Sequence, residues 1–148
     1  MFSEMTILFI LVEVGHVYMS RTSLPVKKYE NIEITDGELS KGIEDVWVSI
    51  QSSKFKSIIV GAVYKHPNTN PDCIVYLERT LQTYSNSGKN MYMLGDLNED
   101  LLKENRLEQI LNKLNLYQRI KEPTRITPRS ETLTDVIITN NGDSVIHA

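Results

Sequence analysis

Residues 57–96 read SIIVGAVYKHPNTNPDCIVYLERTLQTYSNSGKNMYMLGD, and they predict a β-α-β unit. Both ends of this segment are almost wholly apolar, as expected for strands that are buried on both faces. Between them, Asn70 and Pro71 have the sequence of a helix start, and apolar residues follow at spacings of three and four. A crossover helix makes the two strands parallel, so the strand ends at Tyr64 and Asp96 should lie on one rim of the sheet.

Further strands and a second helix are expected on both sides of this unit. Continuous apolar runs predict buried strands, while partial alternation predicts a more exposed edge strand at 26–34. A polar segment with two prolines, residues 121–129, predicts a loop. The other expected elements are strands at 7–12, 15–19, 46–50 and 132–140 and a helix at 107–114. The alternation of strands and helices indicates an α/β fold.

The composition is that of a single folded domain covering residues 1–148, with 41% hydrophobic and 24% charged residues. Cys73 is the only cysteine, which excludes an internal disulfide and favours an intracellular, reducing compartment, nuclear or cytoplasmic. The apolar run at 7–12 is too short to span a bilayer, so no membrane association is expected. The net charge of −3 counts against tight nonspecific binding to nucleic acid.

Two groups of polar residues at predicted strand ends are candidates for chemistry. After the second strand of the unit, Asp96 can take a proton from water or hold a metal ion, and Asn98 can donate to a phosphoryl oxygen. Gly95 is expected to supply the backbone freedom for the tight turn. The same residues also make ordinary turns through side-chain hydrogen bonds, and that alternative stays open. At the end of the first strand, Tyr64 is followed by a cation and by the imidazole of His66, in what is otherwise a proline-containing loop.

Four segments, taken in chain order, resemble the endonuclease/exonuclease/phosphatase superfamily, and more closely the endonuclease domain of non-LTR retrotransposons. They are Val60–Asn68, Met93–Asn98, Pro123–Thr127 and Ser130–Asn140, and the resemblance is clearest over 45–148. It implies an incomplete four-layer α/β sandwich, in which two packed mixed β-sheets are flanked by helices.

The resemblance also implies a reaction, the metal-assisted hydrolysis of a phosphodiester. Asp96 would orient or deprotonate water, Asn98 would stabilise the developing charge, and Tyr64 would donate to the phosphate. Thr132 falls where the family has a small hydroxyl, and Asp135 would orient a catalytic histidine.

The same resemblance implies a cofactor, phosphate contacts and partners. Mg²⁺ would be the cofactor, with Asp96 and Asn98 as candidate ligands. Lys65, Arg125 and Thr127 would bind phosphate. DNA would be the substrate, and a reverse transcriptase encoded downstream would be a further partner.

The chain departs from the family pattern at the positions that bind the metal ion and transfer protons. The family's metal-binding glutamate has no counterpart, since Glu4 and Glu13 lack its context, and the family's Ser-Asp-His tripeptide does not occur. His147 belongs to a stretch resembling the strand that leads up to that tripeptide, so Asp135 lacks its expected partner. We therefore expect a fragment truncated at both ends, with little or no activity.

Two other functions are consistent with the sequence. One is an active phosphohydrolase of the same superfamily that acts on a small phosphorylated substrate, which suits the acidic net charge. The other is a noncatalytic α/β interaction module in which residues 95–98 form only a turn.

Overall fold

A computed structural model describes residues 26–32, 42–52 and 56–142 of the chain. The strands predicted at 7–12 and 15–19 lie outside the described residues. The described elements, in chain order, are β1 Val26–Ile32, β2 Ile43–Ser52, β3 Ile58–Lys65, α2 Cys73–Ser85, β4 Asn90–Asp96, α3 Arg106–Leu114, β5 Tyr117–Gln118, β6 Arg125–Thr127, β7 Ser130–Thr132 and β8 Asp135–Thr139.

Six strands form one mixed sheet in the order β1-β2-β3-β4-β8-β5. β3 and β4 are parallel and joined through α2, so the predicted β-α-β unit is confirmed. The other pairings in this sheet are antiparallel. β1 lies at one edge, as its partial alternation predicts, and β2 lies beside β3.

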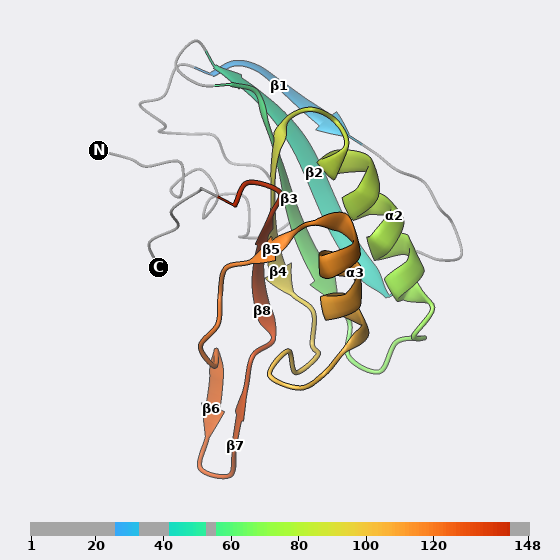
Figure 1. Cartoon of the computed structure of the whole chain (residues 1–148), viewed down its shortest axis with the longest axis vertical. Coiled ribbons are helices and arrows are strands. Elements are labelled where there is room, and N and C mark those ends of the chain that lie inside the picture. Colours follow the sequence, from blue (N-terminus) through green and yellow to red (C-terminus); the bar gives the residue numbers. More distant parts are fainter. Residues whose placement is uncertain (1–25, 33–41, 53–55, 143–148) are drawn as a thin grey trace.

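Both helices cover the same face of the sheet (Figure 1). The apolar core forms between this face and the helices. Helix α2 contributes to it the four residues predicted from their spacing, and Cys73 and Tyr76 in addition; the four are Ile74, Leu77, Leu81 and Tyr84. Buried members of the core include Trp47, Val63, Leu81, Met93 and Ile138. Neither α2 nor α3 has the length and apolar character that a membrane crossing requires.

Helix α2 begins at Cys73, two residues later than the sequence predicts, since Pro71 was expected at the first helical position. The side chain of Asn70 accepts a hydrogen bond from the Asp72 backbone N–H at 3.0 Å, and the Asn70 carbonyl accepts from Cys73 N at 3.1 Å. These bonds close a tight turn before the helix. Asn70 therefore starts the turn and is not the residue that caps the helix.

The predicted loop at 121–129 and the predicted strand at 132–140 are both revised by a small hairpin. β6 and β7 pair as a two-stranded antiparallel sheet that projects beyond the main sheet (Figure 1). Strand β8 begins at Asp135, because the backbone carbonyl of Leu133 accepts from Leu101 N at 2.8 Å and so holds the chain off the sheet. In the described part of the chain, a main sheet, a second small sheet and two helices agree with the predicted incomplete α/β sandwich.

Candidate functional site

Three of the predicted catalytic residues form one row across three neighbouring strands. In the parallel β3–β4 pair, Tyr64 is the register partner of Asp96. In the antiparallel β4–β8 pair, Asp96 is the partner of Asp135. Residues directly opposed on neighbouring strands have Cβ atoms about 4.5–5.5 Å apart, so their side chains are immediate neighbours.

The row lies on the sheet face opposite the helices. Successive side chains of a strand point to opposite faces, and the residue next to each member of the row faces the helices. These helix-facing neighbours are Val63, Leu97 and Val136, all of them in the apolar core. Tyr64 is 39% exposed, and Asp96 and Asp135 are half-buried, so the row is open to a ligand.

The turn after β4 is held by the same residues that were predicted to act in catalysis. The Asp96 carboxylate accepts from the Asn98 backbone N–H at 2.8 Å. The Asn98 amide donates one N–H to the Lys65 carbonyl at 2.6 Å, with Asn98 in the left-handed region at φ 49°. Both the turn and the catalytic interpretation are therefore compatible with the structure, because Asp96 Oδ2, Asn98 Oδ1 and the second amide N–H have no partner among the described residues.

Gly95 is required for a different reason from the one predicted. Its φ is not positive, so it supplies no unusual backbone angle. A Cβ atom placed on Gly95 would instead lie 1.6 Å from the Val63 carbonyl oxygen. Glycine at this position allows β3 and β4 to approach each other directly beneath the row.

Glu44 extends the row onto a fourth strand. It is the register partner of Tyr64 in the antiparallel β2–β3 pair and is exposed. Its Oε1 lies 3.1 Å from Nε2 of His66, whose ring meets the Tyr64 ring edge-on at 4.9 Å between centroids. The sequence placed His66 at this strand end but did not predict Glu44, because the register between two hairpin strands cannot be read from their composition.

Lys65 points away from the row. It follows Tyr64 in β3 and is buried, with its side chain only 8% exposed. Its ammonium lies 3.3 Å from the Glu99 carboxylate. The phosphate contact expected of Lys65 stays a prediction, and this pairing counts against it.

The remaining predicted residues lie on the β6–β7 hairpin. Arg125 and Thr132 are register partners at its base, and both side chains are at least partly exposed. Thr127 lies at its turn, where its hydroxyl accepts from the Ser130 backbone N–H at 3.0 Å. Since β7 leads into β8, the hairpin leaves the sheet at the rim that carries Asp135 (Figure 1).

Three side chains that were not predicted hold Asp135 and the segment before it in place. The Thr124 hydroxyl accepts from Asp135 N at 3.3 Å, and Gln118 donates to the Asp135 carbonyl at 3.3 Å. Asp100 accepts from Leu133 N at 3.3 Å. These are polar side chains in loops and in a two-residue strand, where no sequence periodicity marks them.

Hydrogen bonds also set the charge state of Asp100. Partial burial acts to raise its pKa, but the N–H groups of Leu102 and Leu133 and the ammonium of Lys103 together lower the pKa below its usual value. Asp100 is therefore an ionised structural residue, and it binds backbone groups beside the row.

The row offers few ligands for a metal ion. Among the described residues, no group of three or more His, Cys, Asp or Glu side chains is arranged to hold one. One oxygen of Asp96, the Oδ1 of Asn98 and the carboxylate of Asp135 remain, which suits a Mg²⁺ ion that keeps several of its waters and does not suit a closed protein site.

A cleft of about 440 Å³ lies elsewhere, between α3 and β5. Leu101, Leu107, Leu111 and Leu133 supply much of its lining, and no member of the row contributes to it. The row gathers a phenol, carboxylates and an amide, whereas the cleft is lined mostly by apolar and exposed charged side chains. We therefore take the row as the candidate site.

The fold is similar to that of two solved structures. An endonuclease/exonuclease/phosphatase family protein from Leptotrichia buccalis C-1013-b has 15% sequence identity and a TM-score of 0.53, over 81% of this chain and 52% of that one. The human Nocturnin catalytic domain, solved with a bound sulfate anion, has 16% identity and a TM-score of 0.51, over 79% of this chain and 48% of that one.

At these identities the likeness is one of fold. The chain spans about half the length of each of the two structures. No protein-family model matches the sequence, and no curated protein matches it.

Proposed function

We propose that this chain carries part of a phosphodiesterase site of the endonuclease/exonuclease/phosphatase type, which binds a phosphodiester and hydrolyses it weakly or not at all. The observation that carries the proposal is the direct register of Tyr64, Asp96 and Asp135 at one rim of the sheet. A shared fold alone would not support a function, whereas convergent polar side chains at one rim do.

Each member of the row has a separate role in this proposal. The Tyr64 hydroxyl donates a hydrogen bond to a phosphoryl oxygen, and the free N–H of Asn98 donates to another. Asp96 orients an attacking water and accepts its proton through the carboxylate oxygen that is not bonded to Asn98 N. Asp135, beside Asp96, has no imidazole to orient among the described residues, which is one reason to expect little turnover.

Mg²⁺ is the proposed cofactor, with Asp96 and Asn98 supplying two of its ligands. The ion would neutralise charge on the phosphoryl oxygens, a contribution that carboxylates cannot make. The metal site of the resembled family contains a glutamate. The glutamate in the row is Glu44, and its carboxylate oxygen lies 3.1 Å from Nε2 of His66. Metal binding should therefore be weak, and hydrolysis correspondingly slow.

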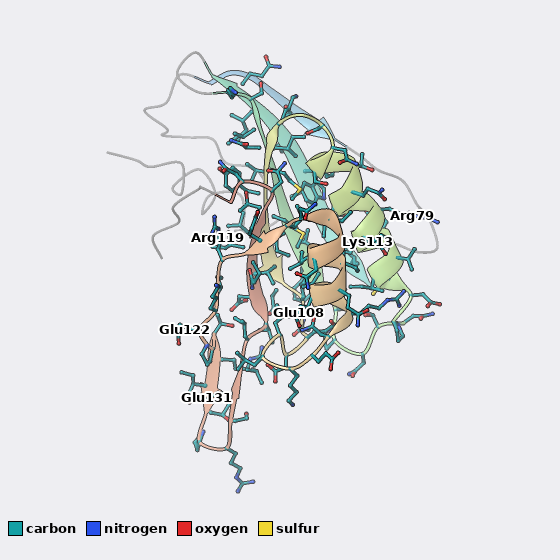
Figure 2. All side chains as sticks on the ribbon, viewed as in Figure 1. Arg79, Glu108, Lys113, Arg119, Glu122 and Glu131 are labelled. Carbon is teal, nitrogen blue, oxygen red and sulfur yellow. The ribbon has the colours of Figure 1, made fainter. Side chains whose placement is uncertain are left out.

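The proposed substrate is DNA, and the exposed arginines of the β6–β7 hairpin support this proposal. Arg125 and Arg129 are exposed on the hairpin, which projects from the rim that carries the row. Figure 2 shows Glu131 on the same hairpin and Glu122 near its base, so the surface there carries both signs of charge. Nonspecific attraction to DNA should accordingly be modest. Retrotransposon origin and a reverse transcriptase encoded downstream follow from the sequence resemblance alone, and an intracellular location remains part of the proposal.

A small phosphorylated substrate is the second candidate. The net charge of −3 and the mixed charges of the hairpin favour it over a long polyanion. Turnover of a nucleoside monophosphate by the wild-type protein, lost on Asp96→Asn substitution and without plasmid cleavage, would establish this second function in place of the first.

The proposal is tested by phosphodiester binding in the presence of Mg²⁺. A thymidine dinucleotide, which has a single diester, should bind the full chain weakly. Tyr64→Phe should weaken binding about tenfold, the loss expected for one hydrogen bond to a charged group. Asp96→Asn should also weaken binding, because it removes a proposed Mg²⁺ ligand. Asp72→Asn is the matched control, because Asp72 is an exposed acid at the start of α2. Equal binding by all variants would refute the site.

Cleavage gives a separate measurement. With Mg²⁺, the purified protein should not nick supercoiled plasmid appreciably, since removal of one transition-state donor typically costs a hundred- to a thousandfold, roughly, in rate. Robust nicking that Asp96→Ala abolishes would show that the site is complete and that the expected low activity is wrong.

A further inference from the structure

The row carries three acidic side chains and lacks a fixed cation. Glu44, Asp96 and Asp135 lie on three of four neighbouring strands, with Tyr64 between the first two. The nearest lysine, Lys65, is turned to the other face of the sheet and is paired with Glu99. A phosphate anion approaching Tyr64 would therefore be repelled unless a positive charge came with it or was already present.

His66 is the described side chain that can supply this charge. Its Nε2 lies 3.1 Å from a carboxylate oxygen of Glu44, and this contact orients the ring. Its ring meets the Tyr64 ring edge-on with 4.9 Å between centroids. The imidazole thus stands next to the hydroxyl-bearing ring at which the phosphate is proposed to bind.

The position of His66 is fixed more firmly than that of an ordinary surface residue. The His66 backbone N–H donates to the Gly42 carbonyl at 2.8 Å, which extends the β2–β3 pairing by one bond past the strand end. An exposed ion pair alone would stabilise the fold little and would fix no geometry. The backbone hydrogen bond restrains the chain at His66. The contact with Tyr64 restrains the plane of the imidazole ring, and the contact with Glu44 restrains the position of Nε2.

We propose that His66, held by Glu44, is a phosphate-binding residue of this site. In its protonated form it keeps the Nε2 contact with Glu44 and donates an Nδ1–H hydrogen bond to an oxygen of a phosphodiester held by Tyr64. The titratable groups facing it are Glu44 on β2 and Tyr64 on β3, with Asp96 next along the row. This inference rests on the proposed phosphodiester site and adds the residue that lets the site bind an anion without a metal ion.

The test is binding of the thymidine dinucleotide to the full chain without added metal ion, at about pH 5.5 and about pH 8, a range over which histidine changes charge. The diester keeps one negative charge throughout, so a change in affinity reports on the protein. Wild type should bind about tenfold more tightly at the lower pH, the difference expected for one charge-assisted hydrogen bond. His66→Gln should remove that gain.

Two further variants separate His66 from its surroundings. Glu44→Gln should reduce the gain in affinity at the lower pH, because the imidazole loses the carboxylate that orients its ring. Arg106→Gln removes one exposed positive charge on α3 and should leave the pH dependence intact. A pH dependence that persists in His66→Gln, or its absence from wild type, would overturn the role of His66.

The outcomes also distinguish this inference from the proposed function. Binding with Mg²⁺ that depends on Tyr64 and Asp96 but not on His66, at either pH, would leave the site standing and remove only His66 from it. Failure of the dinucleotide to bind under any of these conditions would remove both. The imidazole NMR signal of His66, identified by its absence from His66→Gln, should shift on addition of the dinucleotide if the contact is direct.

Discussion

At the level of single residues, Asp96 and Asp135 are directly opposed like charges on neighbouring antiparallel strands. Like charges in this position destabilise a sheet. Asp96 at least gains a hydrogen bond from Asn98 N at 2.8 Å, whereas the Asp135 carboxylate has no hydrogen-bonding or ionic partner among the described residues. A cation or a ligand between the two would relieve the repulsion. The pair therefore has a role in a binding site, whereas it does not stabilise the fold.

Asp135→Asn should therefore stabilise the fold while weakening the site. The expected gain in the free energy of unfolding is about 0.2–1 kcal/mol, the usual size of a cross-strand charge effect. Urea unfolding at neutral pH measures it. Asp72→Asn, an exposed acid with no opposed carboxylate, should change stability by less than about 0.5 kcal/mol. A destabilised Asp135→Asn would mean that the carboxylate makes a favourable contact and that the two acids do not repel.

At the level of elements, the parallel pair β3–β4 is the part of the sheet that aligns the site. Its two strand ends bring Tyr64 opposite Asp96, and the bond from Asn98 to the Lys65 carbonyl ties the following turn to β3. The strands approach closely at Gly95, where a side chain has no room. Site geometry and strand pairing are thus set by the same few residues.

Gly95→Ala should disturb both stability and ligand binding. The added Cβ would meet the Val63 carbonyl oxygen at 1.6 Å, so the strands must separate, at a cost of about 1–3 kcal/mol as for other overpacked sites. Gly142→Ala is the control, since its nearest neighbour at 3.0 Å is the exposed Tyr117 ring. Denaturant unfolding of the two variants gives the comparison. An unchanged stability for Gly95→Ala would mean that the close approach is not maintained in solution.

The elements also show how far sequence reasoning extends. Apolar runs and helical spacing were sufficient for β3, α2 and β4, and the crossover rule then predicted that Tyr64 and Asp96 lie on the same rim of the sheet. The start of α2 and the β6–β7 hairpin were missed because short turns depend on individual hydrogen bonds, such as those of Asn70 and Thr127, and not on periodicity. Glu44 was missed because strand register is a tertiary property.

For the molecule as a whole, the contact between the sheet and α2 contains a cluster of aromatic side chains around one acid. Asp45 accepts from Trp47 Nε1 at 2.9 Å and from the Tyr76 hydroxyl at 2.9 Å. The Tyr84 ring stacks on Trp47 with 4.4 Å between centroids, and its hydroxyl has no hydrogen-bond partner among the described residues. Burial and then the charge of Asp45 raise the pKa of Tyr76, and that of Tyr84, from 10.0 to about 12.

This cluster predicts a loss of stability at alkaline pH. In the unfolded chain the two phenols ionise near the ordinary value of 10.0, whereas in the folded protein they stay protonated to about 12. The unfolded state therefore binds fewer protons in this interval, and stability falls as pH rises through it.

Tyr84→Phe should flatten the decline by up to about 1.4 kcal/mol per pH unit, the contribution of one proton. It leaves the bond between Tyr76 and Asp45 in place. Denaturant unfolding at a series of pH values measures both slopes. Identical slopes for the wild type and Tyr84→Phe would mean that Tyr84 ionises equally in the folded and unfolded chain.

Trp47, the chain's single tryptophan, gives this arrangement a practical consequence for experiments in solution. Its indole is buried against Tyr84 on the helix side of the sheet, while Tyr64, Asp96 and Asp135 occupy the other side. Tryptophan emission should therefore follow the loss of the sheet–helix interface during denaturation and change little when a nucleotide occupies the opposite surface. Folding can therefore be followed through Trp47 emission and ligand binding through the imidazole NMR signal of His66. The two signals can be recorded on one sample, and each reports on only one process.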